Sequence, residues 1–489
     1  MSDILDTFPE YGQTGLLDKL RETEYSFLDD QGHLYLDYTG AGIAAKSQHA
    51  AHNARLTENL FGNPHSLSPT SESSTKLVED ARAQVLSFLN ASPDTYTVIF
   101  TQNATGAARL VGEAYPFTRH KSFVLTADNH NSVNGIREFA RGRSARTVYV
   151  PLTSPELRVN PSGLARALAG HWWEWGIDKI GLAKGSRDRG LFAYPAQSNF
   201  SGVRHPLEWV TLAQKCGFDV LLDTAAYLPT NTLDLSDKNP QPDFLMVSWY
   251  KLFGYPTGVG CLVARRDTLA RLERPWFSGG SVLTAGVGLP WHRLAADEVG
   301  FEDGTLNFLS IPDIQFGLQW LERIRMDLIT TRVRCLTGWF IQRMVAMKHS
   351  DGTPMAQIYG PSSVHRRGGT VCFNFLDAKG KIVDERLVAR ESAAAYISLR
   401  TGCFCNPGGT ENAFGVDAEM LRPYRRRLGK VRSIDTYIDM VGLPSGGAVR
   451  VSFGLVSNTS DVDRFFEFAI GHYRDRVTTR AGLPPRLGC

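Results

Sequence analysis

One lysine, Lys251, stands between an apolar run and a loop rich in glycine. The apolar run is Phe244 to Val247, and the loop continues to Gly260. A strand would therefore deliver this lysine to the rim of a sheet. A lysine that is partly removed from water has a lowered pKa, and its neutral amine can form a Schiff base with an aldehyde cofactor. An isolated lysine is more often a solvated loop residue, so other side chains must decide between the two interpretations.

Two further side chains follow runs that we expect to be strands of the same sheet. Asp223 follows the apolar run Val220 to Leu222, where a carboxylate could keep a ring nitrogen protonated or could simply cap a turn. His130 follows Ser122 to Thr126, where an imidazole could stack on a flat ring, move a proton or serve the structure alone. Ligands of parallel sheets bind beyond the carboxyl ends of the strands, so we expect both residues near Lys251.

A second group of residues could hold a phosphate. Asn103, Ala104 and Thr105 follow an expected strand and open an expected helix, so their backbone N–H groups and the threonine hydroxyl would face an anion. Ser248, three residues before Lys251, could donate to the same anion. Both features are also common in proteins that bind no phosphate.

Two residues further along the chain could contact a cofactor or a substrate. Asn199 follows the apolar run Leu191 to Ala196, and its amide could bond a phenolic oxygen. Arg450 lies inside the apolar run Ala448 to Phe453. A buried guanidinium needs an anionic partner, so we expect either a protein carboxylate or a substrate carboxylate beside it.

Cys403 and Cys405 lie one residue apart in a segment that contains several glycines. They are too close for an ordinary disulfide and lack the second pair of ligands that a zinc site requires. We therefore expect a reactive thiol and no metal. The glycines predict an exposed, mobile loop, although buried cysteines without a chemical role are the common alternative.

The composition is that of a soluble globular protein. The chain has 489 residues, of which 43% are hydrophobic, and its 53 basic and 50 acidic side chains give a net charge of +3. This balance gives no reason to expect a nucleic acid or a membrane as partner, and we interpret the basic run Arg422 to Arg427 as a solvated helix face. The amino terminus resembles no signal sequence, and no apolar run is long enough to span a bilayer, so we expect a cytoplasmic protein.

Short β-rich runs alternate with helical patterns between about residues 95 and 265. This alternation predicts an α/β fold with a mostly parallel sheet and helices on both faces. We expect an amino-terminal segment over residues 1–36 that packs with the small domain, a large domain over 37–305, and a smaller α+β domain over 306–489. The expected strands include Tyr96–Thr101, Arg146–Leu152, Ile180–Ala183 and Cys261–Ala264, and the expected helices are Pro206–Cys216 and one helical stretch from Ile314 to Met347.

Taken together, these residues resemble the class V aminotransferase and cysteine desulfurase family of pyridoxal phosphate enzymes. Within it, the chain is most similar to the amino-terminal domain of eukaryotic molybdenum cofactor sulfurases. The resemblance runs along nearly the whole chain and rests on the motifs Tyr35 to Gly42, Gly62 to Ser66, Pro195 to Gly202, the Lys251 loop, Arg400 to Gly408 and Arg450. It implies the fold of the aspartate aminotransferase-like, pyridoxal phosphate-dependent transferases.

The resemblance also implies roles for individual residues. Lys251 would carry the cofactor, Asp223 would pair with its ring nitrogen, His130 would stack on the ring and Asn199 would bond its phenolate. Asn103, Ala104, Thr105 and Ser248 would hold the phosphate, and the aromatic Tyr250 before the lysine is a feature of the sulfurase branch. Thr305 would reach the phosphate of the neighbouring subunit, which implies a homodimer. Arg450 would bind the substrate carboxylate.

The same resemblance implies the reaction. The motif Arg400 to Cys405 places the nucleophilic cysteine at Cys405, with Cys403 as second choice. We expect a cysteine desulfurase that takes sulfur from L-cysteine as a persulfide, releases alanine and passes the sulfur to an unidentified acceptor. The chain ends at Cys489, where we expect no room for a domain that binds molybdenum cofactor. The alternatives are a carbon–sulfur lyase, or another transformation of a different amino acid in a biosynthetic pathway, and a non-enzymatic carrier that kept the fold.

Overall fold

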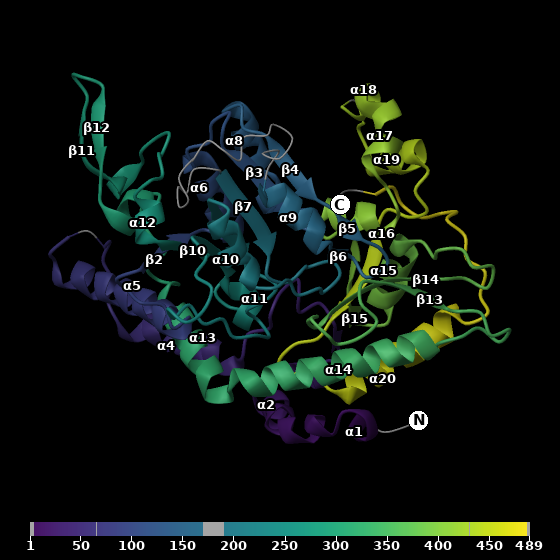
Figure 1. Cartoon of the computed structure of the whole chain (residues 1–489). Coiled ribbons are helices and arrows are strands. Elements are labelled where there is room, and N and C mark those ends of the chain that lie inside the picture. The colour runs from purple at the N-terminus through teal and green to yellow at the C-terminus, as the bar shows by residue number, and fades with distance from the viewer. Residues whose placement is uncertain (1–3, 65, 170–189, 430, 487–489) are drawn as a thin grey trace.

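A seven-stranded sheet forms the centre of the amino-terminal two thirds of the chain (Figure 1). The computed structural model describes residues 4–64, 66–169, 190–429 and 431–486. The strand order is β2–β10–β9–β8–β7–β3–β4, in which only β10 runs antiparallel to its neighbours. The strands are β2 (Tyr96–Thr101), β3 (Ser122–Thr126), β4 (Thr147–Val150), β7 (Gly190–Pro195), β8 (Phe218–Asp223), β9 (Phe244–Ser248) and β10 (Gly260–Arg265). The predicted mostly parallel sheet is confirmed, while the expected strand Ile180–Ala183 lies outside the described residues.

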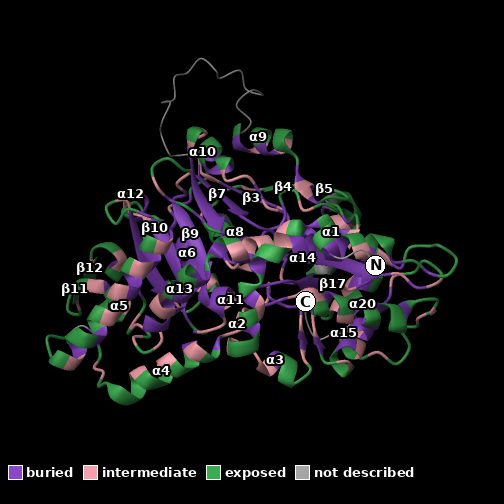
Figure 2. Ribbon diagram, turned by 90° about the horizontal axis from the view of Figure 1, so that it is seen from below, coloured by how far each residue is buried: buried purple, intermediate pink, exposed green. Residues whose placement is uncertain are grey.

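Helices cover both faces of this sheet because every central strand is apolar on both sides. Ile99, Leu125 and Leu221 pack with one group of helices: α6 (Ala104–Ala114), α8 (Ile136–Gly142) and α12 (Arg266–Leu269). The alternate residues of the same strands, such as Val98 and Val220, pack with the other group: α5 (Pro69–Phe88), α10 (Glu208–Lys215) and α13 (Pro312–Ile324). Figure 2 shows the sheet buried and the outer helix faces exposed. Strands buried on both faces read as continuous apolar runs, which is why the sequence revealed them.

A second, antiparallel sheet of four strands organises the carboxyl-terminal part. Its order is β13 (Ala356–Tyr359), β14 (Thr370–Phe375), β17 (Ala448–Ser452) and β16 (Arg400–Gly402). Helix α14 (Met326–Ala346) and helix α20 (Thr459–Tyr473) cover it, and the ring of Phe340 lies within about 5.5 Å of those of Phe453 and Phe465. Helices and an antiparallel sheet thus pack together in this part of the chain, and α14 runs along it in Figure 1.

Two expected elements are divided in the structure. The helical stretch Ile314–Met347 is two helices, because Arg325 adopts a left-handed φ of 77° and ends α13. The expected strand Arg146–Leu152 is likewise two pieces, β4 and the short β5 (Leu152–Thr153), separated by Pro151, which has no N–H to donate. Helix α10 begins two residues inside the predicted helix, and Gly217 follows it with a φ of 85°.

The amino-terminal segment lies against the carboxyl-terminal part. Buried Arg332 of α14 bonds the hydroxyl of Thr14 and the carboxylate of Asp18, and buried Arg21 bonds Asp461 of α20. Strand β1 (Leu34–Tyr35) pairs in parallel with β15 (Ile397–Ser398). We propose from these contacts that the first 36 residues belong with the small domain.

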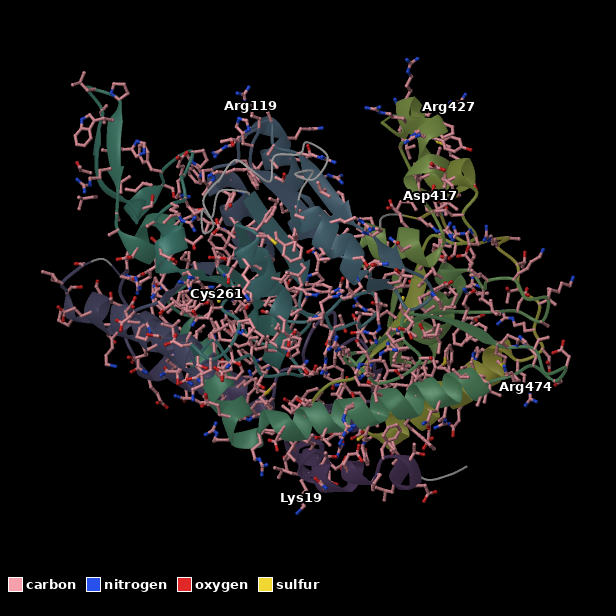
Figure 3. All side chains as sticks on the ribbon, in the orientation of Figure 1. Lys19, Arg119, Cys261, Asp417, Arg427 and Arg474 are labelled. Atoms are coloured by element: carbon pink, nitrogen blue, oxygen red, sulfur yellow. The ribbon has the colours of Figure 1, made fainter. Side chains whose placement is uncertain are left out.

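Two surface features extend from the body of the molecule. The hairpin of β11 (Val282–Gly286) and β12 (Trp291–Leu294) projects from one end in Figure 1. At the other end the basic run is exposed, and Arg427 of α18 (Arg425–Leu428) points into solvent (Figure 3). Among the helices described here, none combines the length and apolar character needed to cross a bilayer.

Candidate active site

The loop after β9 holds Lys251 at the carboxyl edge of the large sheet. Lys251 lies in the short helix α11 (Trp249–Phe253), whose Trp249 and Phe253 are buried and stacked. Gly254 ends this helix with a φ of 78°, and a Cβ there would lie 2.1 Å from the backbone nitrogen of Ala44. Glycine is therefore required at that position, and the close approach fixes the lysine against the segment that begins at Asp37.

The strand ends around Lys251 line a cavity at the carboxyl edge of the sheet. Nine of the predicted site residues line it: Lys251, Asp223, His130, Asn103, Ala104, Thr105, Asn199, Ser248 and Tyr250. Ser132, Pro195, Gln197, Ala225, Ala226 and Met246 complete the lining. The residues come from the ends of β3, β7, β8 and β9 and from the start of α6, as expected for a parallel sheet.

The Asp223 carboxylate and the burial of Lys251 have opposite effects on the lysine amine. Burial lowers the pKa of the Lys251 amine, while the Asp223 carboxylate opposes that shift. Asp223 is buried at the end of β8, and its Oδ1 accepts a 2.9 Å hydrogen bond from the N–H of Ala225. The turn-capping role considered for this aspartate is therefore real, and the residue also lines the cavity.

His130 is held in one orientation by its neighbours. The N–H of Ser132 donates to His130 Nδ1 at 3.1 Å, so the neutral ring carries its proton on Nε2. The hydroxyl of Ser132 lies 2.9 Å from the same nitrogen and 2.7 Å from the hydroxyl of Thr105. Burial and the neighbouring Lys251 both lower the pKa of His130, which favours the neutral ring.

The amino-terminal end of α6 opens towards the same cavity. The Asn103 side chain caps the helix by accepting a 2.9 Å bond from the N–H of Gly106. The N–H groups of Ala104 and Thr105 belong to the first turn and have no partner within the helix. A Cβ at Gly260 would lie 2.7 Å from the nitrogen of Ala104, so this glycine allows β10 to pass close to the first turn of α6. The arrangement suits an anion.

The loop that carries Cys403 and Cys405, called the cysteine loop below, is hydrogen-bonded to residues at the rim of the cavity. The N–H of Asn131, next to His130, donates to the carbonyl of Cys405 at 2.7 Å. Asn199, which lines the cavity, donates from Nδ2 to the carbonyl of Phe404 at 2.8 Å. The fully buried Asn406 donates to the Asp128 carbonyl at 2.7 Å and to Asn199 Oδ1 at 2.8 Å. These four bonds hold the loop beside the lysine cavity.

The two cysteines of this loop differ in their surroundings. Cys405 is partly exposed and has a left-handed φ of 53°. Cys403 is only 3% exposed and lines a different cavity, which it shares with Glu411 and Tyr437. The expectation of an exposed loop is therefore wrong at Cys403, which is buried. Cys405 is the better candidate for chemistry.

Arg450 has a protein carboxylate as its partner. Its Nη2 lies 2.8 Å from Asp37 Oδ1, and its Nη1 donates to the carbonyl of Asn199 at 3.1 Å. Arg400 binds the other oxygen of Asp37 through Nε at 2.9 Å and Nη2 at 2.8 Å. Arg450 therefore lies beside the cavity lining, through Asn199, rather than within it.

Thr305 lies apart from the lysine cavity. It is exposed and lines a separate cavity with Gln102, Gly106 and Asp303. Three residues with prominent contacts, Asn406, Asp37 and Ser132, received no role from the sequence. Their only signal was position: Asn406 and Asp37 lie inside motifs, and Ser132 follows His130 closely enough to cap it.

Comparison with known proteins gives consistent relatives. A family model described as aminotransferase class-V matches residues 34–168 and 179–465. The molybdenum cofactor sulfurase of Solanum lycopersicum is 36% identical over 491 residues, which cover 96% of this chain and 59% of that protein. The human molybdenum cofactor sulfurase is 34% identical over 481 residues, covering 93% of this chain and 51% of that protein. The chain thus spans little more than half the length of these curated relatives.

Solved structures show the same fold at lower identity. The apo cysteine desulfurase of Thermococcus onnurineus NA1 has a TM-score of 0.71 and 21% identity, covering 92% of this chain and 96% of that chain. The cysteine desulfurase CsdA of Escherichia coli has a TM-score of 0.67 and 19% identity, covering 94% of this chain and 99% of that chain. The expected transferase fold is therefore confirmed.

Proposed function

Because the chain belongs to the class V aminotransferase family, we propose that it is a pyridoxal phosphate-dependent cysteine desulfurase, which moves sulfur from L-cysteine to Cys405 and releases alanine. The observation that carries this proposal is the attachment of the cysteine loop to the lysine cavity. Asn131 binds the Cys405 carbonyl directly beside His130, and Asn199 joins the cavity lining to the same loop. A thiol held at this place can meet a substrate that Lys251 also reaches.

Pyridoxal phosphate is the cofactor of this family, and the cavity fits it. Lys251 offers an amine for the aldehyde, Asp223 a carboxylate for the ring nitrogen and His130 a flat neutral ring. The first turn of α6 and Ser248 offer donors for the phosphate. When bound, the cofactor withdraws electrons from the α-carbon of an amino acid.

The chain's own residues supply the remaining steps. The Lys251 amine, whose pKa is lowered by burial, can take the α-proton of the substrate. Arg450 can bind the substrate carboxylate, and the Cys405 thiolate can attack the substrate sulfur. The substrate carbon–sulfur bond breaks, a sulfur–sulfur bond forms on Cys405, and a proton is added to the former thiol-bearing carbon. Two thiols thereby give one persulfide and alanine, without an external oxidant or reductant.

The test is incubation of the purified holoenzyme with L-cysteine, with alanine quantified and the persulfide located by mass spectrometry. We expect alanine formation in the wild type and in Cys403→Ser, and its loss in Cys405→Ser. Alanine formation that persists unchanged in Cys405→Ser would reject the persulfide mechanism. In that case a lyase product from another amino acid should be sought.

We also propose that two copies assemble and that the sulfur passes to a separate acceptor. Thr305 is exposed and away from the cavity of its own chain, as a residue that serves a second copy would be. The nearby hairpin exposes Leu283, Val287 and Leu289. Molybdenum cofactor, for which the relatives are named, is the first acceptor to test, by following labelled sulfur from Cys405.

A further inference from the structure

Two arginines face each other across the small sheet. Arg400 of β16 and Arg450 of β17 are direct partners in the antiparallel register. Like charges at such positions repel, because their Cβ atoms lie only about 5 Å apart. Asp37 lies between the two guanidinium groups and bonds both of them. The pairing therefore depends on a carboxylate supplied by a distant segment of the chain.

The backbone places Asp37 firmly at this point. Asp37 forms an isolated parallel bridge with Ser452, and the N–H of Ser452 donates to the carbonyl of Leu36 at 2.8 Å. The turn after Asp37 brings Gly40 so close that a Cβ there would lie 2.3 Å from the carboxylate. Glycine at this position leaves the space in which the carboxylate reaches the arginines.

The cluster contains one positive charge more than it contains negative charges. Two guanidinium groups share a single carboxylate, and the buried Nε–H of Arg450 has no hydrogen-bond partner among the residues that the structure describes. Burial lowers the pKa of Arg450, and the Asp37 carboxylate opposes this shift. A cluster with one excess positive charge suits a ligand with one carboxylate.

We propose that Asp37 is a positioning residue that aims Arg450 at the substrate carboxylate and, through Arg400, anchors the cysteine loop to the same point. This inference rests on the proposed function, because it takes an α-amino acid with a single carboxylate as the ligand. Asp37 acts through the two arginines rather than on the substrate. Arg400 begins β16, the strand that leads to Cys405. The Asp37 carboxylate therefore links Arg450, which would bind the substrate, to the cysteine loop.

The test compares Asp37→Asn with Asp18→Asn in the holoenzyme. Asp18 is a matched control because it also pairs with a buried arginine, at 2.6 Å, but that arginine is Arg332 and not Arg450 or Arg400. The dissociation constant of L-alanine is measured from the change in cofactor absorbance. The rate of Cys405 alkylation by iodoacetamide is measured separately.

We expect Asp37→Asn to raise the L-alanine dissociation constant about tenfold or more and to speed the alkylation of Cys405, while Asp18→Asn changes neither. Asp37→Glu, which keeps the charge, should have an L-alanine dissociation constant between those of the wild type and Asp37→Asn. If Asp37→Asn does not fold, an unchanged dissociation constant in Asp37→Glu would overturn the proposal. Equal changes in Asp37→Asn and Asp18→Asn, or none in either, would overturn the proposal. Alanine formation from L-cysteine by the wild type reports on the desulfurase function independently, because the L-alanine titration needs no turnover.

Discussion

Asn199 donates its side-chain amide to the carbonyl oxygen of Phe404 at 2.8 Å, so a residue that lines the lysine cavity also holds the cysteine loop. Its Oδ1 accepts at the same time from Asn406, whose second donated bond reaches Asp128. The side chain expected to bond the cofactor is thus shared with the loop. Cofactor binding and loop position are therefore expected to depend on each other.

Replacing Asn199 by alanine should release the loop. Both amide bonds disappear and leave the carbonyl of Phe404 without this donor, which costs about 1–3 kcal/mol if it stays buried. We expect faster alkylation of Cys405 and a tenfold or larger drop in alanine formation, by the order of magnitude of such losses. The matched control is Asn231→Ala, because Asn231 is also buried and bonds a backbone carbonyl, that of Tyr227. Equal effects of the two variants would contradict the prediction.

Gly408→Ala should displace the start of α16 (Pro407–Ala413). A Cβ at this position would lie 2.0 Å from the carbonyl oxygen of Ala127, so the loop must move away from the sheet edge. We expect a loss of about 1–3 kcal/mol in stability, and alanine formation should fall while the cofactor stays bound. Thermal unfolding and alanine assays measure the two effects. Gly471→Ala in α20 is the control, because nothing lies within 4 Å of that Cβ and the helix should gain stability. A Gly408→Ala enzyme as active as the wild type would show that the loop tolerates the shift.

The reactivity of Lys251 should begin at lower pH than that of an ordinary lysine. Burial lowers its pKa from the usual 10.5, and an amine reacts in its neutral form, so the onset of reaction moves downward. The Asp223 carboxylate opposes this shift; Asp223→Asn should therefore lower the onset further. Acylation of the cofactor-free protein at a series of pH values, followed by peptide mass spectrometry, gives both midpoints. A midpoint that rises in Asp223→Asn would have the wrong sign.

The exposed hairpin should lie in the contact between two copies. Leu289 is 72% exposed at its tip, and exposed apolar groups of this kind mark interaction surfaces. Leu289→Glu should shift the sedimentation coefficient of the wild type towards that of a monomer. Val345→Glu on α14, also at an exposed apolar side chain, should leave it unchanged. A wild type that already sediments as a monomer would exclude the contact.

Thr305 should act on the cavity of the second copy. If so, Lys251→Ala and Thr305→Ala chains are each impaired, but a mixed dimer contains one intact cavity, made of Lys251 from one chain and Thr305 from the other. Mixing the two impaired proteins under conditions that exchange subunits should raise alanine formation above that of either variant alone. If Thr305→Ala alone is fully active, Thr305 has no role in the site.

The strands of the large sheet could be predicted because burial on both faces leaves an apolar run in the sequence. The helix break at Arg325 could not, since neither Arg325 nor the residues around it, Ile324 and Met326, are glycine or proline. The end of β4 was also placed too far along the chain, although Pro151, which has no N–H to donate, was a local signal of the break.

A site residue could be predicted from the sequence where it directly follows a strand of the sheet. Residues that follow strands, such as Asp223 and His130, could be brought together because parallel strands end at one edge. The partnership of Asp37 with Arg450 joins segments that are far apart in the sequence, and only strand pairing reveals it. The burial of Cys403 likewise left no local pattern in the sequence.

The pairing of β16 with β17 has one further consequence. Arg450 and the strand that leads to Cys405 belong to the same small sheet, so a movement of that sheet changes their distance from Lys251 but not from each other. The distance between Arg450, which would bind the substrate carboxylate, and Cys405, which would accept the sulfur, then limits the length of the substrate. Homocysteine, whose sulfur lies one carbon further from its carboxylate, should be desulfurated much more slowly than cysteine in the same assay.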